Sequence, residues 1–392
     1  MRTQVGIVGA GPAGLVLAHL LHLHGIESVI VEDRSREYCA HRIRAGVLEQ
    51  GTADLLVETG VGERLLRERL LHHGIDLRFE GRTHRIDFAE LTGRAVTVYG
   101  QHEVVKDLIA ARLAAGLPIL FETAALGVDG VDGPAPRIRV RGPDGREDTI
   151  DCDFVAGCDG FRGVCRAAVP AGALTAYERV YPYAWLGILA QAPPSSDELI
   201  YTSHERGFAL LSMRSPELSR LYIQVSPDDD IAAWSDARIW EEMHRRFAAP
   251  EEGWSLTEGP VLQKGITAMR SFVAEPMRFG RLFLAGDAAH IVPPTGAKGM
   301  NLAVADVRVL ARALEAFYRQ GRTDRLDAYS HTCLRRVWRV QHFSWWMTQM
   351  LHRDPAGNPF DRRRQIAELQ GVMASRAVAQ ALAENYVGLP FE

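Results

Sequence analysis

The sequence is poor in cysteine, nearly balanced in charge and free of long apolar runs. Its five cysteines form no CxxC pair and do not cluster with histidine at metal-ligand spacing, so we expect reduced thiols and no metal site. A formal net charge of -4 leaves no basic footprint for nucleic acid or an anionic membrane, and neither is expected as a partner. The apolar stretches end short of the roughly 18 to 20 residues of a membrane helix, and no export signal precedes the first strand. We therefore expect a cytoplasmic protein.

The composition is that of a folded globular protein, with 47% apolar and 24% charged residues. A chain of 392 residues exceeds the usual size of one domain, so two lobes, or one lobe with a smaller insertion, are expected. An apolar run at 4–8, helical periodicity over 15–21 and a second apolar run at 28–31 predict a β-turn-α-β unit. Further buried strands are expected at 153–157 and 281–285, which gives an α/β fold with a parallel sheet.

Three other regions have a different pattern. Alternating residues over 198–225, broken by a turn at 215–217, predict a separate antiparallel sheet. The stretch 130–145 is rich in Gly, Pro and Asp and is expected to be a loop. From residue 301 onward the pattern is helical, with one apolar stripe that we interpret as core or as a dimer face. The stripe consists of Phe343, Trp346, Met347, Met350 and Leu351.

Residues Gly9 to Gly14 follow the pattern GxGxxG between the first strand and the helix. Gly9 allows a tight turn, Gly11 lets a pyrophosphate approach the backbone, and Gly14 permits close helix packing. The helix N-terminus adds free N–H groups and the positive end of its dipole. Glu32 ends the second strand about twenty residues further on and can bind ribose hydroxyls. Strand, glycines, helix and acid together predict a dinucleotide site.

Two further segments that follow strands carry acidic groups. In the segment 284–290, Asp287 comes directly after a strand, where a carboxylate can accept hydrogen bonds from a polyol. A helix expected to begin near Gly299 would direct its N-terminus toward an anion, whereas the plainer interpretation is a helix cap and a proline-rich loop. The segment 158–166 holds Asp159 in a similar position.

In their order and spacing, these three segments resemble the group A flavoprotein aromatic hydroxylases, which bind FAD on one dinucleotide fold and have no second such fold. The chain has a single GxGxxG, in agreement with that pattern. Four further stretches are similar to the members of the family that hydroxylate 4-hydroxybenzoate, and the similarity covers essentially the whole chain. They are residues 42–50, 178–182, 344–347 and 384–390.

The resemblance implies a Rossmann-like FAD-binding domain, an inserted mixed or antiparallel substrate sheet, a C-terminal helical region and a homodimer. The FAD-binding domain is expected at 1–72, 97–176 and 270–320, the substrate sheet at 73–96 and 177–269, and the helices at 321–392.

A carboxylate anchor can be built from two neighbouring strands. Ser212 and Arg214 share one strand face, as do Arg220 and Tyr222, and a hairpin through 215–219 would bring the two faces together. Arginine suits bidentate carboxylate recognition, although solvent-facing arginines are the plainer interpretation of such strands. The resemblance assigns Ser212, Arg214 and Tyr222 to the substrate carboxylate and Arg220 to the flavin.

The resemblance also implies a proton relay from the substrate phenol through Tyr201 and Tyr386, with His72 at the solvent end. Phenol and tyrosine both titrate near 10, so a proton can pass between them without a large energy step, and histidine exchanges with water near neutral pH. The Pro294 carbonyl and the Thr295 side chain are expected to line the substrate ring or the flavin edge.

Further cofactor contacts follow from the same resemblance. Contacts to FAD, beyond the glycine turn and Glu32, are expected from Arg42, Arg44, Gln101, Asp159, Arg220, Asp287, Lys298, Gly299 and Asn301, with Trp185 near the substrate entrance. Contacts to the nicotinamide cofactor are expected from Asp33, Arg34, Tyr38, Arg162 and Arg270. Asp33 would repel a 2′-phosphate and favours NADH, whereas Arg34 and Arg42 favour NADPH, and our preference is NADH.

The implied function is that of a flavin-dependent monooxygenase. NAD(P)H reduces FAD, O2 adds as a C4a-hydroperoxide, and the ring carbon beside the phenolate oxygen is hydroxylated. With 4-hydroxybenzoate the product is 3,4-dihydroxybenzoate. Two alternatives stay open: a related phenolic acid, such as 3,4-dihydroxybenzoate, as the substrate, or a flavoprotein that binds FAD without catalysis.

Overall fold

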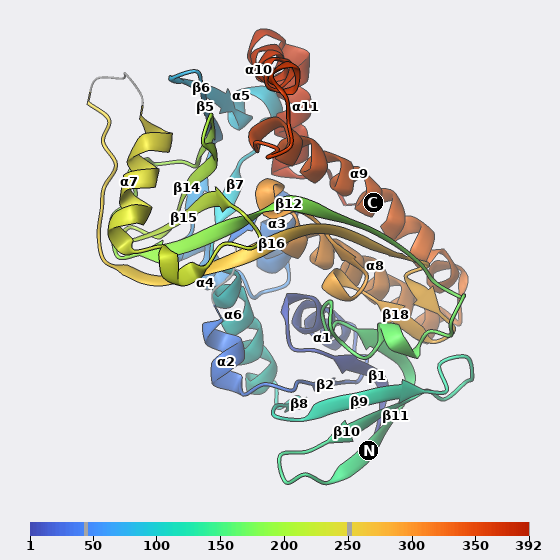
Figure 1. The fold of residues 1–392 in the computed structure, drawn as a ribbon. Coiled ribbons are helices and arrows are strands. Elements are labelled where there is room, and N and C mark those ends of the chain that lie inside the picture. The colour runs from blue at the N-terminus through green and yellow to red at the C-terminus, as the bar shows by residue number, and fades with distance from the viewer. Residues whose placement is uncertain (43–45, 249–252, 392) are drawn as a thin grey trace.

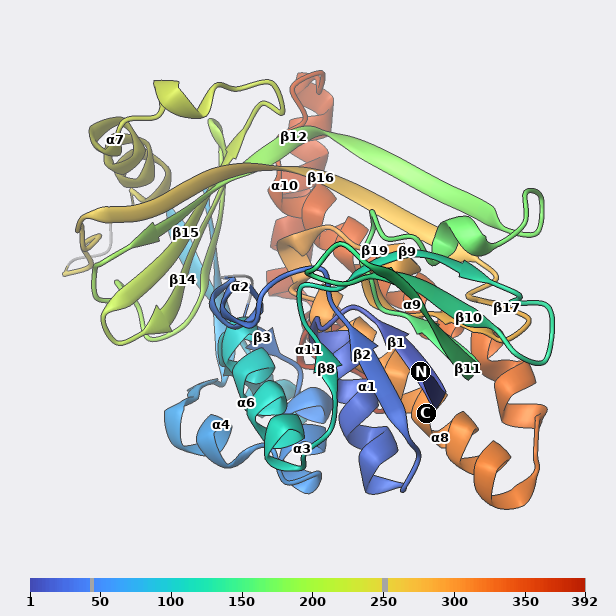
Figure 2. The ribbon, with the colours of Figure 1, turned by 90° about the horizontal axis from the view of Figure 1, so that it is seen from below.

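The computed structural model describes residues 1–42, 46–248 and 253–391. Within these ranges the strands form two eight-stranded sheets and one three-stranded sheet, with helices between and around them (Figures 1 and 2). No helix in the described ranges combines the length and the apolarity that crossing a membrane requires.

The first sheet contains the expected β-turn-α-β unit. Its central strand β1 (Arg2–Val8) pairs in parallel with β2 (Ser28–Val31) and with β11 (Glu147–Gly157). In turn, β2 pairs in parallel with β8 (Ile119–Leu120), and β11 with β18 (Leu282–Leu284). The strand order is β17-β18-β11-β1-β2-β8, in which β17 is Arg278–Phe279. Together with the helices α1 (Pro12–Leu23) and α8 (Gly299–Gln320), which pack against each other, this order confirms the α/β class.

Parallel strands end at a common edge, and the predicted cofactor residues follow these ends. Gly9 follows β1, Glu32 follows β2, Asp159 lies two residues after β11, and Asp287 lies just beyond β18. Ligands of open α/β sheets bind outside the carboxyl ends of the strands. The fold therefore brings four segments that are far apart in the sequence to one edge.

The same sheet carries an antiparallel extension. β9 (Ala124–Asp129) pairs with β10 (Arg137–Arg141), which pairs with β11, while β17 (Arg278–Phe279) pairs with β18. The expectation of a loop over 130–145 is therefore wrong for β10. Its Ile138 and Val140 alternate toward the core, a strand pattern that the flanking Gly and Pro residues obscured.

The second sheet has the order β19-β16-β12-β15-β14-β13-β5-β6 and confirms a separate sheet over 198–225. All its pairs are antiparallel except β13 with β5. Its strands are β5 (Gly74–Phe79), β6 (Arg82–Asp87), β12 (Thr175–Ala190), β13 (Ile200–His204), β14 (Gly207–Ser215), β15 (Leu218–Val225), β16 (Val261–Glu275) and β19 (His290–Ile291). Because β12 and β16 pair from one end to the other, the sheet crosses the domain boundaries predicted after 176 and 269.

A small third sheet and the helices complete the described fold. The sheet consists of β3 (Val47–Leu48), β4 (Leu70–His72) and β7 (Val96–Val98). The α-helices are α1 (Pro12–Leu23), α2 (Arg36–His41), α3 (Gln50–Glu58), α4 (Glu63–Glu68), α5 (Phe88–Thr92), α6 (Gln101–Ala114), α7 (Asp236–Phe247), α8 (Gly299–Gln320), α9 (Asp324–Leu351), α10 (Pro359–Ala374) and α11 (Arg376–Val387). Short 3-10 helices are η1 (Arg166–Ala168), η2 (Ile231–Ala233), η3 (Gly286–Ala288) and η4 (Pro294–Gly296).

The apolar stripe of α9 faces the core, as one of its two predicted interpretations had it. Phe343, Met347, Met350 and Leu351 are buried in a cluster with residues of the second sheet, and Trp346 packs against that cluster. Helices α10 and α11 pack beside α9 (Figure 1), while α7 covers the opposite face of the sheet. One face of the second sheet is thus enclosed by the helices that follow α8.

Candidate active site

The glycine turn lies between β1 and α1, and its geometry requires glycine at two positions. Gly9 has a φ of +105°, and a Cβ there would lie 2.3 Å from the carbonyl oxygen of Cys158. A Cβ on Gly14 would lie 2.0 Å from the carbonyl oxygen of Gly9, so α1 packs directly on the turn. Gly11, the N-cap of α1, has no atom within 4 Å of a Cβ position and offers no side-chain cap. This open space beside the free N–H groups of a helix fits a pyrophosphate.

Two carboxylates flank the turn. Glu32 accepts hydrogen bonds from the backbone N–H groups of Ala10 (2.7 Å) and Arg34 (3.0 Å). Burial, with a further contribution from Asp33, raises the pKa of Glu32 to about 7. Asp287 lies in η3 and is exposed. The turn and the two acids fit the ADP and ribityl parts of FAD, which offer a pyrophosphate and hydroxyl groups.

A buried ion pair, which the sequence analysis did not single out, holds the Asp287 loop. Asp306 of α8 accepts a hydrogen bond from the backbone N–H of Gly286 (3.0 Å), and its carboxylate lies 2.6 Å from Nε2 of His290. Both side chains are buried. The sequence did offer a signal for this pair. Asp306 stands on the apolar face of a predicted helix, and a buried carboxylate needs a partner.

The loop after β11 is held by its own residues. Asp159 accepts a hydrogen bond from the backbone N–H of Cys165 (2.8 Å), and burial raises the pKa of this carboxyl group. Its second oxygen is buried and has no hydrogen-bond partner among the described residues. Arg166 donates to the carbonyl oxygens of Phe161 (2.6 Å) and Ala288 (2.8 Å), and so joins this loop to the Asp287 loop.

Lys298 and Asn301, which we expected to contact FAD, use their side chains inside the protein. Nζ of Lys298 donates to Oε1 of Glu49 (2.7 Å) and to the carbonyl oxygen of Tyr386 (2.8 Å). The amide of Asn301 binds backbone groups, including the N–H of Glu49 (2.9 Å). Both side chains are buried, and a buried ammonium group needs a carboxylate, so the Lys298 side chain is held by Glu49 beside the start of α8.

The other residues predicted to contact FAD lie at the ends of helices, where the structure describes them. Gly299 begins α8 and Gln101 begins α6, while Arg42 follows α2 and is exposed. Arg44 lies outside the described residues.

The nicotinamide candidates fall into two groups. The first is an exposed cluster around α2, in which Arg34 pairs with Asp33 at 3.4 Å. The guanidinium groups of Arg34 and Arg42 lie 5.4 and 5.6 Å from the ring centre of Tyr38. Cations and a carboxylate therefore share one surface, and the charges there do not favour one nicotinamide cofactor.

The second group lies at the loop after β11, in which Arg166 binds the carbonyl oxygen of Phe161. Arg270 of β16 pairs with Glu178 at 3.2 Å and lies 4.8 Å from the ring centre of Phe161. Arg162, the next residue in the chain, is exposed.

The hairpin of β14 and β15 builds a basic cluster, by which we mean Ser212, Arg214, Arg220 and Tyr222. Ser212 lies opposite Arg220 in the register, and its hydroxyl donates to the carbonyl oxygen of Arg220 (2.8 Å). The phenol oxygen of Tyr222 accepts from Arg220 (3.3 Å) and Arg214 (3.5 Å). The structure confirms that the hairpin brings the two strand faces together. A Cβ on Gly187 would lie 2.8 Å from Arg220, so this glycine leaves room for the guanidinium group.

The basic cluster carries unpaired positive charge. Among the described residues neither Arg214 nor Arg220 makes an ion pair, and the buried Nε of Arg214 has no hydrogen-bond partner. Burial lowers the pKa of Arg214. Burial alone would raise the pKa of Tyr222, but the two guanidinium groups outweigh it and lower this pKa. A buried N–H donor in a cationic cluster fits an anionic ligand such as a carboxylate.

Tyr201 of β13 and Tyr386 of α11 form a buried pair, on the face of the second sheet that also carries Tyr222 of the basic cluster. Their hydroxyl oxygens lie 2.6 Å apart, and Tyr201 also donates to the carbonyl oxygen of Thr295 (3.1 Å). The strand register places Tyr201, Leu210 and Tyr222 in one row across β13, β14 and β15. Two strand spacings, about 10 Å, therefore separate the tyrosine pair from the basic cluster. Burial raises the pKa of both paired tyrosines above the value near 10 that the relay prediction assumed.

His72 does not meet solvent, contrary to its predicted place at the end of the relay. Its side chain is fully buried, and neither ring nitrogen has a hydrogen-bond partner among the described residues. Burial lowers the pKa of His72 to about 4, so the ring is neutral at physiological pH. The exposed neighbour is His73, the residue that follows β4, because successive side chains of an extended segment point to opposite sides. Of the predicted relay, the described hydrogen bonds include the contact between Tyr201 and Tyr386 and none to His72.

The remaining substrate candidates lie between the sheet and α9. Pro294 is exposed, and its carbonyl oxygen accepts from the N–H of Ala297 (2.9 Å), whereas the buried hydroxyl of Thr295 lies 2.8 Å from that of Thr348. Trp185 is buried rather than placed at an entrance. Its Nε1 donates to Nε2 of the buried His352 (2.6 Å), because an indole N–H inside a core needs an acceptor.

These features define an FAD-dependent oxidoreductase with one dinucleotide site and a separate substrate sheet. The family model described as FAD binding domain matches residues 2–344. The chain is 52% identical over its whole length to the p-hydroxybenzoate hydroxylase of Acinetobacter baylyi, of which it covers 96%. The chain belongs to the group A FAD-dependent aromatic hydroxylases.

More distant relatives agree in fold. The 3-(3-hydroxy-phenyl)propionate/3-hydroxycinnamic acid hydroxylase of Mycolicibacterium smegmatis is 28% identical over 83% of the chain and 57% of that relative. The solved structure of p-nitrophenol 4-monooxygenase from Pseudomonas putida has a TM-score of 0.81 at 21% identity, with 99% of both chains covered. Aklavinone-11 hydroxylase, solved with FAD and aklavinone, has a TM-score of 0.74 at 24% identity over 92% of this chain and 72% of its own. The expected fold class is confirmed.

Proposed function

We propose that this chain hydroxylates 4-hydroxybenzoate at the 3-position. The observation that carries the proposal is a sheet face with a basic cluster and a buried tyrosine pair about two strand spacings apart. The whole-length similarity to a p-hydroxybenzoate hydroxylase supports it. In the balanced reaction, 4-hydroxybenzoate, O2, NAD(P)H and a proton give 3,4-dihydroxybenzoate, NAD(P)+ and water. The related phenolic acid considered above receives no comparable support.

The basic cluster would bind the substrate carboxylate. Arg214 offers a buried N–H without a partner, and the hydroxyl groups of Ser212 and Tyr222 lie on the same face. A carboxylate there would pair with one or both guanidinium groups, which are now compensated by no acidic side chain among the described residues. The substrate ring would then extend along the row toward Tyr201.

The tyrosine pair would bind the phenol and take its proton. Tyr201 would accept the proton of the substrate hydroxyl. Its own hydrogen, which points to the Thr295 carbonyl in this structure, would turn and move to Tyr386 across the 2.6 Å contact, and Tyr386 would release its own proton toward solvent. Loss of the phenol proton makes the ring carbon beside that oxygen electron-rich, which directs hydroxylation to it. Burial of the pair excludes water from this end of the site.

FAD would be held by the glycine turn, Glu32 and Asp287, with the N-terminus of α8 near its ring. When bound, it supplies the electron transfer from NAD(P)H and the activation of O2. The exposed cluster around Tyr38 and the surface with Arg162 and Arg270 are the two candidate contacts for the nicotinamide cofactor. Steady-state rates with NADH and NADPH decide between the two cofactors.

The test is a panel of 4-hydroxybenzoate, 3-hydroxybenzoate, 3,4-dihydroxybenzoate and benzoate, scored for NAD(P)H oxidation, hydroxylated product and hydrogen peroxide. We expect near-stoichiometric 3,4-dihydroxybenzoate from 4-hydroxybenzoate and little product from the others. Tyr201→Phe should bind the substrate and oxidise NAD(P)H but release mainly peroxide. The control is Tyr181→Phe, a buried tyrosine that binds Ser271 outside this site. Full coupling in Tyr201→Phe would refute the relay.

A further inference from the structure

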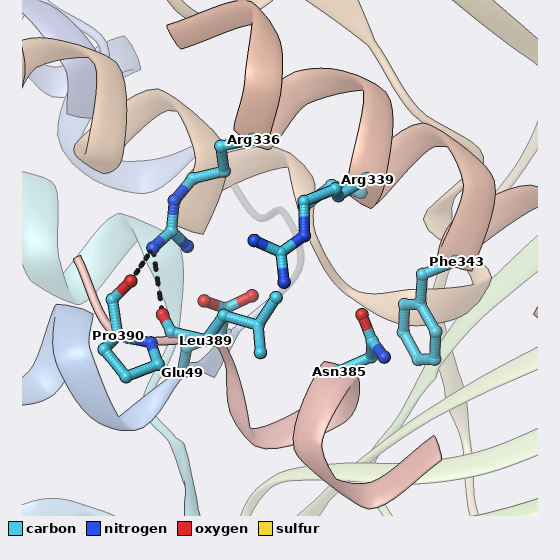
Figure 3. A pocket seen from close by; sticks show the side chains of 8 residues that line it. Glu49, Arg336, Arg339, Phe343, Asn385, Leu389 and Pro390 are labelled. Atoms are coloured by element: carbon cyan, nitrogen blue, oxygen red, sulfur yellow. Dashed lines mark hydrogen bonds between the residues drawn. The ribbon is translucent and has the colours of Figure 1, made fainter. Parts of the chain in front are cut away.

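After α11 the chain continues as a short segment, Gly388–Phe391, which we call the strap. It lies against Glu49 and Gly51 of the predicted FAD-binding domain. A pocket lies beside it, and Figure 3 shows its lining. The lining residues are Glu49, Arg336, Arg339, Val340, Phe343, Asn385, Leu389 and Pro390. Two arginines of α9 border this pocket, and they differ in what they bind.

Arg336 clamps the strap. Its guanidinium group donates to the carbonyl oxygens of Leu389 (2.9 Å) and Pro390, as the dashed lines in Figure 3 show. The same group lies 5.2 Å from the ring centre of Phe391, and Arg308 lies 4.7 Å from it. A guanidinium group that binds two backbone carbonyls and a ring fixes a segment that has no regular secondary structure of its own.

The strap fits closely against the FAD-binding half at Glu49. Gly388 has a φ of +94°, and a Cβ there would lie 2.2 Å from Oε2 of Glu49, so only glycine lets the chain turn at this point. Oε1 of Glu49 binds the ammonium group of Lys298, which also donates to the carbonyl oxygen of Tyr386. Arg94 donates to the carbonyl oxygen of Gly388 (3.3 Å).

These contacts converge on one residue of the proposed relay. The backbone of Tyr386 is bound by Lys298 of the predicted FAD-binding domain, and the clamped strap begins two residues later, at Gly388. The Tyr386 hydroxyl must stay within hydrogen-bond distance of Tyr201, which belongs to the second sheet. A shift of even 1 Å would break this contact, because proton transfer requires about 2.6 to 3.2 Å between heavy atoms.

We infer that the strap, clamped by Arg336, is a positioning element that sets Tyr386 against Tyr201 and thereby keeps hydroxylation coupled to NAD(P)H oxidation. The inference rests on the proposed function. It makes Arg336 a positioning residue that acts through its contacts with the strap. A merely structural role would lower stability and FAD content but would leave the ionisation of the bound phenol unchanged.

The experiment compares Arg336→Gln with Arg339→Gln in the FAD-loaded enzyme. Arg339 borders the same pocket three residues further along α9, is exposed, and makes no hydrogen bond or ion pair with the described residues (Figure 3). The measurements are product and peroxide per NAD(P)H, the Kd of 4-hydroxybenzoate, and the absorbance change that reports the phenolate fraction of the bound substrate. Arg336→Lys tests rescue, and Phe391→Ala removes the ring between the two guanidinium groups.

For Arg336→Gln and Phe391→Ala we expect at least a threefold fall in product per NAD(P)H, a matching rise in peroxide and a smaller phenolate fraction. The Kd should stay within about twofold of wild type, Arg336→Lys should recover part of the coupling, and Arg339→Gln should match wild type. The inference is overturned if coupling and phenolate fraction are unchanged in Arg336→Gln, or if Arg339→Gln loses as much. If Arg336→Gln does not fold, Phe391→Ala and Arg336→Lys decide by the same criteria. Wild type that fails to hydroxylate 4-hydroxybenzoate would refute the proposed function instead.

Discussion

Replacing Arg214 with glutamine gives the most direct measure of the basic cluster. The side chain keeps a polar group, but it is about two bonds shorter and loses its charge and its fork of donors. In the structure Arg214 donates to the carbonyl oxygen of Met213 (2.7 Å) and contacts Tyr222, while its buried Nε has no partner. A substrate carboxylate would supply the missing acceptor.

The magnitude follows from the burial of this group. Truncating one partner of a buried, hydrogen-bonded charge pair costs about 2 to 4 kcal/mol. That range corresponds to a Kd for 4-hydroxybenzoate about 30- to 700-fold weaker in Arg214→Gln. Arg214→Lys restores the charge without the planar fork, so it should recover only part of the loss.

The assay is a titration of wild type and variant with both 4-hydroxybenzoate and 4-hydroxybenzamide, followed by flavin absorbance. The neutral amide should lose little affinity on going from wild type to Arg214→Gln, and the difference between the two ligands gives the coupling energy of the charge pair. Equal losses for both ligands at unchanged FAD content would refute the pairing and make Arg214 a packing residue.

Three further predictions concern buried polar groups. Trp185→Phe should lower the free energy of unfolding in urea by about 1 to 3 kcal/mol, because it leaves the buried Nε2 of His352 without a donor; an unchanged midpoint would contradict this. Burial lowers the pKa of His290, but Asp306 outweighs burial and raises it above its usual value, so this pair stabilises fully below pH about 6.5 and less as pH rises through the raised pKa. Asp306→Asn should therefore lose more stability at pH 6 than at pH 9 in thermal or urea unfolding. His72 has a pKa lowered to about 4, so wild type should lose stability as pH falls from about 6.5 to 4, by about 3 kcal/mol, and His72→Gln should remove that slope.

The dinucleotide half could be predicted because its signals are local. Gly9, Gly11 and Gly14 stand between a strand and a helix that the apolar pattern already identifies, and backbone geometry requires glycine there. The meeting of the Ser212 face with the Arg220 face was also predictable, because a short turn joins the two strands of a hairpin. In both cases the interacting residues are close in sequence.

The partners of buried polar side chains could not be predicted from the residues. Tyr201 and Tyr386 are 185 residues apart, and only the family resemblance brought them together before the structure did. Lys298 follows a proline-rich loop at a predicted helix start, where nothing in the local pattern indicates that Glu49 will bind it. The burial of His72 has the same cause: a short strand alternates its side chains, but the pattern does not say which side the rest of the chain covers.

The two ends of the proposed substrate site have opposite electrical character, and this difference selects one orientation of a phenolic acid. The pKa of Tyr222 is lowered by two guanidinium groups, whereas the pKa values of Tyr201 and Tyr386 are raised by burial. A carboxylate at the tyrosine end would be desolvated without a cation, which costs several kcal/mol. In the opposite orientation the carboxylate gains its cations and the neutral hydroxyl meets neutral tyrosines. Under the proposed function, charge would therefore place the phenol oxygen beside Tyr201, and the anchor for the carboxylate would also determine which ring carbon is offered for reaction.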